Sequence, residues 1–114
     1  MKNRDLMLSV ASDYTDTPGP RYKWQGKYSG EEFYNELLRP KFLDAESQGI
    51  KLIVNLDDVE GYGSSFLEES FGGLTREFGT KRVEKTLKIQ SEDSLLISEV
   101  EDYIKGIYDK NEMA

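Results

Sequence analysis

The residues whose side chains could most readily take part in chemistry are two pairs of neighbouring carboxylates near the middle of the chain. Asp57 and Asp58 directly follow an apolar stretch, and carboxylate oxygens are ligands that divalent cations prefer. Because no third ligand stands nearby, solvated loop carboxylates are favoured over a weak ion site. Glu68 and Glu69 suggest acid–base chemistry, but adjacent side chains on a helix point about 100° apart and do not converge on one atom. Glu68 is instead expected to help cap a helix.

Two absences restrict catalysis further. The 114 residues include no cysteine, which excludes disulfides, thiolate zinc sites and cysteine nucleophiles. They include no histidine either, so the commonest general base near neutral pH and the serine–histidine pair are missing. An enzyme would need a magnesium site at Asp57 and Asp58. We therefore expect no enzyme, no metal and no cofactor.

The charge balance argues against a nucleic-acid partner. Acidic residues outnumber basic ones by 22 to 15, giving a net charge of −7, whereas phosphate backbones are bound by clustered Lys and Arg. The most basic stretch contains Lys81, Arg82, Lys85 and Lys88. We interpret it as a solvated face, with docking of an acidic partner as the lesser alternative.

A glycine-rich turn from Gly61 to Phe66 is the best candidate for a contact surface. Tyr62 lies between Gly61 and Gly63, and aromatic residues on such loops are favoured contact residues. The glycines have the alternative explanation that a tight turn needs positive φ. Ser64 and Ser65 precede an amphipathic run, so helix capping competes with a contact role. The predicted partner-binding residues are Gly61, Tyr62, Gly63, Ser64, Ser65, Phe66 and Glu69.

The segments that position this turn alternate between strands and helices. The predicted order is a strand at Leu6–Val10, a short strand at Arg21–Trp24, a helix from Ser29 to Gly49, a strand at Ile50–Leu56, a helix from Ser65 to Phe78, a strand at Thr86–Gln90 and a final helix after Ser91. The strand at 50–56 is almost continuously apolar, which is typical of a central strand with both faces covered. The Gly61–Phe66 turn then follows the carboxyl end of that strand, where α/β proteins meet their ligands.

Local signals mark where these helices begin and end. Ser29 and Glu32 have the spacing of a capping box, and Ser65 with Glu68 repeats it. Pro40 falls inside the first helix and predicts either a kink or two helices that meet. The aromatic residues Tyr22, Trp24 and Tyr28 form either part of the core or a second contact surface.

Together these features predict one α/β domain over residues 1–114, with an approximately four-stranded mixed sheet flanked by three to four helices. Residues 1–4 and 109–114 are expected to fray. No apolar run approaches the roughly 20 residues that a membrane helix needs, and no signal peptide is recognisable. A cytoplasmic location is therefore expected.

Three stretches resemble the STAS-like domains of unknown function catalogued as DUF4325: Pro18–Tyr22, Ser29–Phe33 and Ser64–Leu74. The resemblance extends over nearly the whole chain. The segment Lys51–Leu74 is also similar to the signature of the bacterial STAS anti-sigma-factor antagonists. In those proteins an apolar strand leads through a short loop to Asp-Ser-Ser-Gly, and a helix starts at the serines.

The resemblance implies a fold of about four strands with helices around them and a role as a protein-binding regulatory module. In the antagonists, a partner of the histidine-kinase-like ATPase family phosphorylates the first serine of the pair, which corresponds to Ser64. Here Gly63 replaces the Asp before the serines, and Phe66 replaces the Gly after them. The first of these departures weakens the expectation of a phosphorylation switch and leaves the docking surface in place.

An alternative is a small acidic inhibitory protein of a mobile genetic element or phage. Its binding surface would be the acidic C-terminal helix, with Glu92, Asp93, Glu99, Glu101, Asp102, Asp109 and Glu112 against Lys105 and Lys110. The sequence leaves the identity of the partner and the oligomeric state open.

Overall fold

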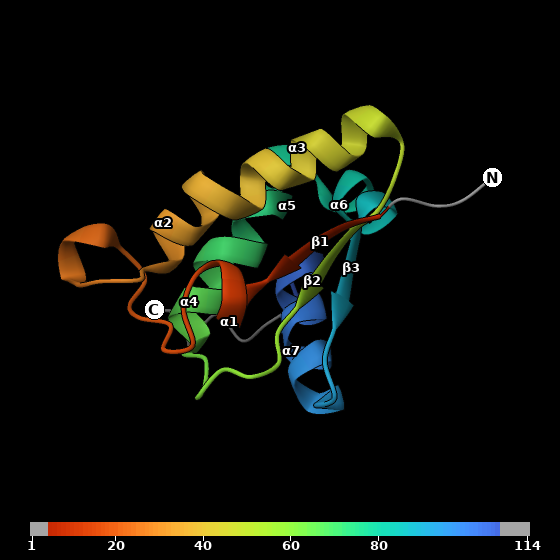
Figure 1. Cartoon of the computed structure of the whole chain (residues 1–114). Helices are drawn as coiled ribbons and strands as arrows, with labels where there is room; N and C mark the ends of the chain where they lie inside the picture. The colour runs from red at the N-terminus through yellow and green to blue at the C-terminus, as the bar shows by residue number, and fades with distance from the viewer. Residues whose placement is uncertain (1–4, 108–114) are drawn as a thin grey trace.

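The computed structural model describes residues 5–107 (Figure 1). Within this range, three strands form one parallel sheet in the order β1-β2-β3, namely β1 (Leu6–Ser9), β2 (Leu52–Asn55) and β3 (Leu87–Gln90). The α/β class is confirmed, whereas the expected four-stranded mixed sheet is corrected to three parallel strands. The predicted fraying of 1–4 and 109–114 lies outside the described residues.

The expected strand at Arg21–Trp24 does not form. These residues belong to a loop that contains the 3₁₀ turn η1 (Lys23–Gln25). The turn closes because Gln25 N–H donates to the Tyr22 carbonyl at 3.0 Å, and Tyr22 N–H donates to Gln25 Oε1 at 2.9 Å. The alternation of polar and aromatic residues there reflects an exposed loop, not a strand with one buried face.

Before β2, residues 30–48 form one continuous helical rod. It consists of α2 (Gly30–Phe33), the wide π turn η2 (Tyr34–Leu38) and α3 (Arg39–Gln48). In the wide turn, Arg39 N–H donates to the Tyr34 carbonyl five residues back. This wider hydrogen-bonding pattern lies directly before Pro40, which has no N–H to donate. The helix therefore continues through the proline instead of breaking there.

A second rod connects β2 to β3 and again contains a π turn. It consists of α4 (Ser64–Leu67), η3 (Glu68–Gly72) and α5 (Gly73–Phe78). Gly79, with φ of 91°, separates it from α6 (Thr80–Thr86), a helix that the sequence patterns did not reveal. The rod begins at Ser64, not Ser65, and its N-cap Gly63 has no side chain, so the second predicted capping box does not form.

The first and last helices also differ from expectation. The short helix α1 (Val10–Asp13) directly follows β1 (Leu6–Ser9). Val10 is therefore the first residue of this helix and not the last residue of the strand. The final helix α7 (Ser94–Lys105) is capped by Asp93, whose Oδ1 accepts from Leu95 N–H and Leu96 N–H at 3.0 and 3.2 Å, and not by Ser91. Ile107, predicted on its core face, lies beyond the helix and is 62% exposed.

Within residues 5–107, the helices cover one face of the sheet. Because the strands lie in sequence order and are parallel, right-handed crossovers bring both helical rods to the same side (Figure 1). The row Leu8, Val54 and Ile89 is buried against those helices. On the opposite face, Met7 of β1 is 54% exposed and its neighbour Ile53 on β2 is only partly buried, so the described residues do not cover both faces of β2 as expected.

The core lies between the sheet and the rods and holds the two rods close together. Phe33 of α2 stacks on Phe66 of α4 with ring centroids 5.6 Å apart. Gly73 lies against the ring of Tyr34, where an added Cβ would be 3.3 Å from Cε1. Close packing of the two rods therefore accounts for the glycine at position 73. In the part of the chain that the structure describes, no helix is both long and apolar enough to cross a membrane.

Candidate functional site at the carboxyl edge of the sheet

The Gly61–Phe66 turn lies where the sequence predicted, between the carboxyl end of β2 and the start of α4 (Figure 1). Two hydrogen bonds position the segment. Glu60 N–H donates to the carbonyl of Asp16, and the Tyr62 hydroxyl donates to the carbonyl of Leu56, both at 2.9 Å. The turn is therefore fastened to the loop that follows β1 as well as to its own strand.

A shallow hollow of about 260 Å³ opens beside this turn. It lies between the loop after β2 and the start of α7, and we refer to it as the carboxylate hollow. Its lining combines apolar side chains with four acidic ones: Leu56, Val59, Tyr62 and Leu96 with Asp57, Asp58, Glu60 and Asp93, together with Gly61 and Ser91. Asp58, Glu60 and Asp93 are exposed, so the hollow offers apolar surface within a negatively charged surround.

Tyr62 lines the hollow and also supports the turn. Its ring is partly buried and lies 6.0 Å from the ring of Phe66. Burial, followed by the nearby charge of Asp57, raises the pKa of the Tyr62 hydroxyl well above its ordinary value. Tyr62 therefore stays protonated and donates to the backbone while one side of its ring faces the hollow.

Phe66 is the one predicted contact residue that the structure removes from the surface. Its side chain is fully buried and lies among Phe33, Tyr14 and Tyr62, with ring centroids 5.6, 6.4 and 6.0 Å away. The first turn of α4 directs this side chain into the core. Phe66 thus belongs to the packing beneath the turn.

The backbone conformation does not require glycine at positions 61 and 63. Gly63 has φ of −80°, and Gly61 is not among the glycines with positive φ. A Cβ added at either position would meet nothing within 4 Å. The residue with left-handed geometry in this loop is Asp58, with φ of 67°. Neither the conformation nor the space inside the molecule requires glycine at 61 or 63.

Ser64 and Ser65 begin α4, and both are exposed. Within residues 5–107 neither hydroxyl takes part in a hydrogen bond, so neither serine caps the helix through its side chain. Ser29, by contrast, is buried and accepts from Glu32 N–H at 3.0 Å, which confirms Ser29 as the cap of α2. Within the described residues the Glu32 side chain makes no return bond, so only this half of the predicted capping box forms. The two serines of the turn are left with free, accessible hydroxyl groups.

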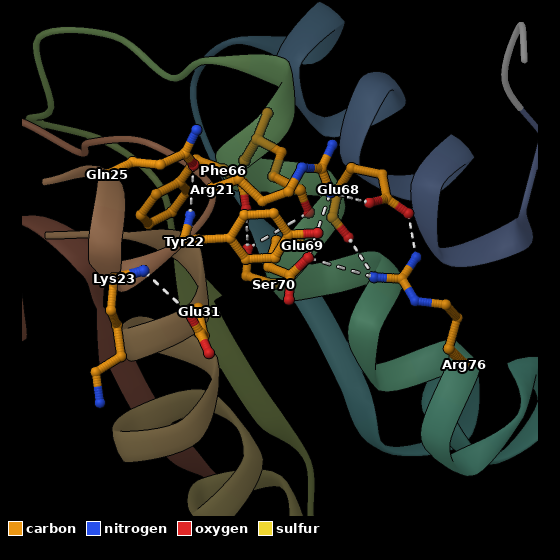
Figure 2. A network of polar contacts seen from close by, with 11 residues as sticks. Arg21, Tyr22, Lys23, Gln25, Glu31, Phe66, Glu68, Glu69, Ser70 and Arg76 are labelled. Atoms are coloured by element: carbon orange, nitrogen blue, oxygen red, sulfur yellow. Dashed lines mark hydrogen bonds and ion pairs between the residues drawn. The ribbon is translucent and has the colours of Figure 1, made fainter. Parts of the chain in front are cut away.

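Glu68 and Glu69 form part of an ion-pair network that ties the second rod to the loop before α2 (Figure 2). Glu68 is only 4% exposed and lies between Arg21, 2.5 Å from Oε1, and Arg76. Burial alone would raise the pKa of Glu68, but the hydrogen bonds and charges of the two arginines hold it below its usual value. Glu69 is partly buried and pairs with Arg21 at 3.3 Å.

This network was not foreseen, because its members are far apart in sequence. The π turn η3 and Gly72 together make room for the buried carboxylate, since a Cβ on Gly72 would lie 2.9 Å from Glu68 Oε2. The only sequence signal was Arg21 itself, within the motif at 18–22. Its partner could be identified only once the fold brought residues 47 positions apart into contact.

The aromatic residues of the loop before α2 are exposed to different degrees. Trp24 is 82% exposed, whereas Tyr22 and Tyr28 are 38% and 43% exposed. Tyr28 contacts Tyr14 edge-on at 5.7 Å, which joins the loop to the core. The sequence left open whether these aromatic residues belong to the core or to the surface. For Trp24 the structure decides for the surface.

Asp57 forms hydrogen bonds with the loop that follows β3. Its Oδ1 accepts from the hydroxyl of Ser91 at 2.7 Å and from Glu92 N–H at 3.1 Å, so it joins the loops after β2 and β3. Among the described residues, no group of three His, Cys, Asp or Glu side chains has a geometry that suits a metal ion. In the basic stretch, Arg82 forms a bidentate ion pair with Glu46, with distances of 2.8 and 2.6 Å. One positive charge of the stretch is therefore already paired.

Comparison with known proteins decides the family. The model of the STAS-like domain of unknown function (DUF4325) matches residues 29–95, which is more than half of the chain. The chain belongs to this family. No curated protein and no solved structure matches it. The matched part of the STAS-like domain contains both helical rods, β2, β3 and the whole Gly61–Phe66 turn.

Proposed function

We propose that this STAS-like domain is a non-enzymatic regulatory module that binds a protein at the carboxyl edge of its sheet. The contact surface consists of the exposed face of the turn, at Gly61, Tyr62, Gly63, Ser64 and Ser65, together with the carboxylate hollow beside it. Phe66 and Glu69 support this surface from behind.

The observation that carries the proposal is the pair of free hydroxyl groups on Ser64 and Ser65. Both serines are exposed at the start of a long rod, and within residues 5–107 neither hydroxyl takes part in a hydrogen bond. Glycines next to them fulfil no need of the backbone, so a partner has unhindered access. The absence of histidine and cysteine, and the structural role of Asp57, make contact a better explanation of this surface than catalysis.

The same observation supports Ser64 as a phosphorylation site. A phosphate of charge about −1.5 to −2 on this exposed hydroxyl would add negative charge at the start of α4, directly after the segment that lines the hollow. The added charge would change which partner the surface accepts. A histidine-kinase-like ATPase is the class of partner that the family resemblance suggests.

The test is co-purification of the tagged full-length domain with an ATPase of this class encoded beside it, followed by mass spectrometry of the serines. We expect phosphate on Ser64, and loss of the complex with Ser64→Glu and with Tyr62→Ala. Ser47→Glu on the exposed side of α3 is the matched control and should retain the partner. Full binding by both turn variants would remove the proposal.

The acidic face of the C-terminal helix supports a second candidate, an inhibitor that acts by charge mimicry. The described acidic residues Glu92, Asp93, Glu99, Glu101 and Asp102 are all exposed, while Asp109 and Glu112 lie outside the described residues. Binding through this face should weaken steeply as salt rises. Binding through the turn should depend on salt much less, so one titration separates the two candidates.

A further inference from the structure

The most exposed aromatic side chain of the described residues belongs to the loop of residues 18–28, which we call the Trp24 loop. Trp24 is the single tryptophan of the chain, and 82% of its surface is in contact with solvent. Tryptophan is also among the residues that contribute most to binding energy when an interface covers them. An exposed side chain of this kind buries little apolar surface in its own molecule and so adds little to its stability.

Hydrogen bonds hold the Trp24 loop in a fixed conformation. Gly19 N–H donates to the carbonyl of Tyr28 at 2.9 Å across the base of the loop. The carbonyls of Pro20 and Arg21 accept from Gly30 and Glu31 at 2.8 and 2.9 Å, which joins the loop to α2. Because the backbone is already ordered, little conformational entropy remains to be lost when Trp24 is bound.

The charges of the Trp24 loop are opposite to those of the rest of the chain. No acidic residue occurs between Asp16 and Glu31, although the whole chain has a net charge of −7. Lys23 and Lys27 are exposed on either side of Trp24. The surface that fits this loop is therefore apolar and surrounded by carboxylates.

The carboxylate hollow is such a surface. Its volume of about 260 Å³ is below the roughly 300–1,000 Å³ of sites for drug-sized ligands, so it suits a single side chain better than a small molecule. Carboxylates of Asp58 and Glu60 are exposed and make no hydrogen bond within the described residues.

Trp24 cannot reach the hollow of its own molecule. The loop projects from the start of α2, well separated from the start of α7 that lines the hollow (Figure 1). Its backbone bonds to α2 fix it there. The two surfaces can therefore meet only between different molecules.

We propose that Trp24 of one copy inserts into the carboxylate hollow of a second copy, with Lys23 and Lys27 against Asp58 and Glu60. This head-to-tail contact goes beyond the proposed function and does not depend on it. One loop in one hollow buries less area than the roughly 1,200–2,000 Å² of stable interfaces, so the association is weak and reversible. The pair keeps one free loop, on one copy, and one free hollow, on the other, so the contact extends into larger assemblies unless it closes into a ring.

The contact has a consequence for binding, because it covers the hollow next to the Gly61–Phe66 turn. A protein partner that docks on the turn then competes with the loop of a second copy. Dilution of the domain frees its docking surface.

Sedimentation velocity on the full-length domain, from low micromolar to millimolar concentration, tests the proposal directly. We expect the average mass to rise with concentration and the tryptophan emission to shift to shorter wavelength as Trp24 is covered. Trp24→Ala should weaken association roughly 30-fold, the effect of removing a binding hot spot. Lys23→Glu with Lys27→Glu should do the same, whereas Lys81→Glu with Lys88→Glu changes the net charge equally and should not.

A mixing experiment distinguishes this contact from a symmetric dimer in which loop meets loop or hollow meets hollow. Trp24→Ala keeps an intact hollow, and Asp58→Asn with Glu60→Lys keeps an intact loop. Asparagine is chosen because it tolerates the positive φ of Asp58. Each variant alone should stay monomeric, and an equimolar mixture should form a one-to-one complex. The proposal would be overturned if the wild-type domain stayed monomeric with unshifted emission, or if the two variants did not complement each other. The Trp24 loop would then be expected to bind a different protein.

Discussion

The Gly61–Phe66 turn and the Trp24 loop make an instructive pair, because each contains aromatic residues among glycines at the same edge of the sheet. In the turn, Phe66 is fully buried and Tyr62 is partly buried. In the loop, Trp24 is 82% exposed. Two segments of similar composition therefore use their aromatic side chains in opposite ways.

The difference arises from the way each segment enters its helix. The turn leads directly into α4, whose first turn faces α2 at close range, so Phe66 falls between the two rods. The loop closes on itself through η1 before α2 begins, and its tip projects beyond the layer of helices (Figure 1). Exposure is decided by the direction in which the next helix leaves, and not by the type of side chain.

The largest expected contrast is between removal of the two aromatic rings. Phe66→Ala leaves a cavity in the core and should lower the free energy of unfolding by about 3–5 kcal/mol. Trp24→Ala should change it by less than about 0.5 kcal/mol, because no packing is lost. Urea unfolding of both variants measures the contrast. Equal losses would mean that Trp24 packs against the domain in solution.

The second contrast concerns Glu68, which lies just beyond the turn and holds Arg21 of the loop. Glu68→Gln should cost about 2 kcal/mol, below the roughly 3–5 kcal/mol of fully buried pairs because Arg76 is half exposed. Glu69→Gln, with longer and more exposed contacts, is the matched control and should cost less than about 1 kcal/mol. The measurement is again the unfolding free energy at neutral pH.

The pH dependence of the Glu68 variant gives an independent check. The pKa of Glu68 in the folded state is below the ordinary value of 4.5, so its ionised form stabilises the fold above that pH. This contribution is lost as pH falls through the folded-state pKa. The difference in stability between wild type and Glu68→Gln should therefore shrink below about pH 4.5. A difference that is constant down to acid unfolding would contradict the role of the charge.

The smallest contrast is between the serines at the starts of the two rods. Ser29, directly after the Trp24 loop, is a true cap, and Ser29→Ala should cost about 1 kcal/mol. Ser64→Ala in the turn removes a hydroxyl with no hydrogen bond and should stay within about 0.5 kcal/mol of wild type. Thermal unfolding resolves the two values. A cost at Ser64 equal to that at Ser29 would show that its hydroxyl serves the fold.

Much of the fold could be predicted because its signals are local. The strand at 52–55, the helix start at Ser29 and the helix end at Gly79 each depend on residues within a few positions of one another. The position of the turn at the carboxyl edge could be inferred from the alternation of strands and helices. The number of strands was wrong because Arg21–Trp24 has the alternation of a strand but no neighbouring strand to pair with.

By itself, the sequence determined the family, the α/β class, the place of the Gly61–Phe66 turn and the absence of histidine and cysteine chemistry. The tertiary structure alone decided that Phe66 is core, that Trp24 is surface and that Glu68 pairs with Arg21. The physical reason is the range of the interactions. Caps, turns and hydrophobic periods are set by neighbours in the chain, whereas burial and ion pairing depend on segments that meet only after the rods have packed on the sheet.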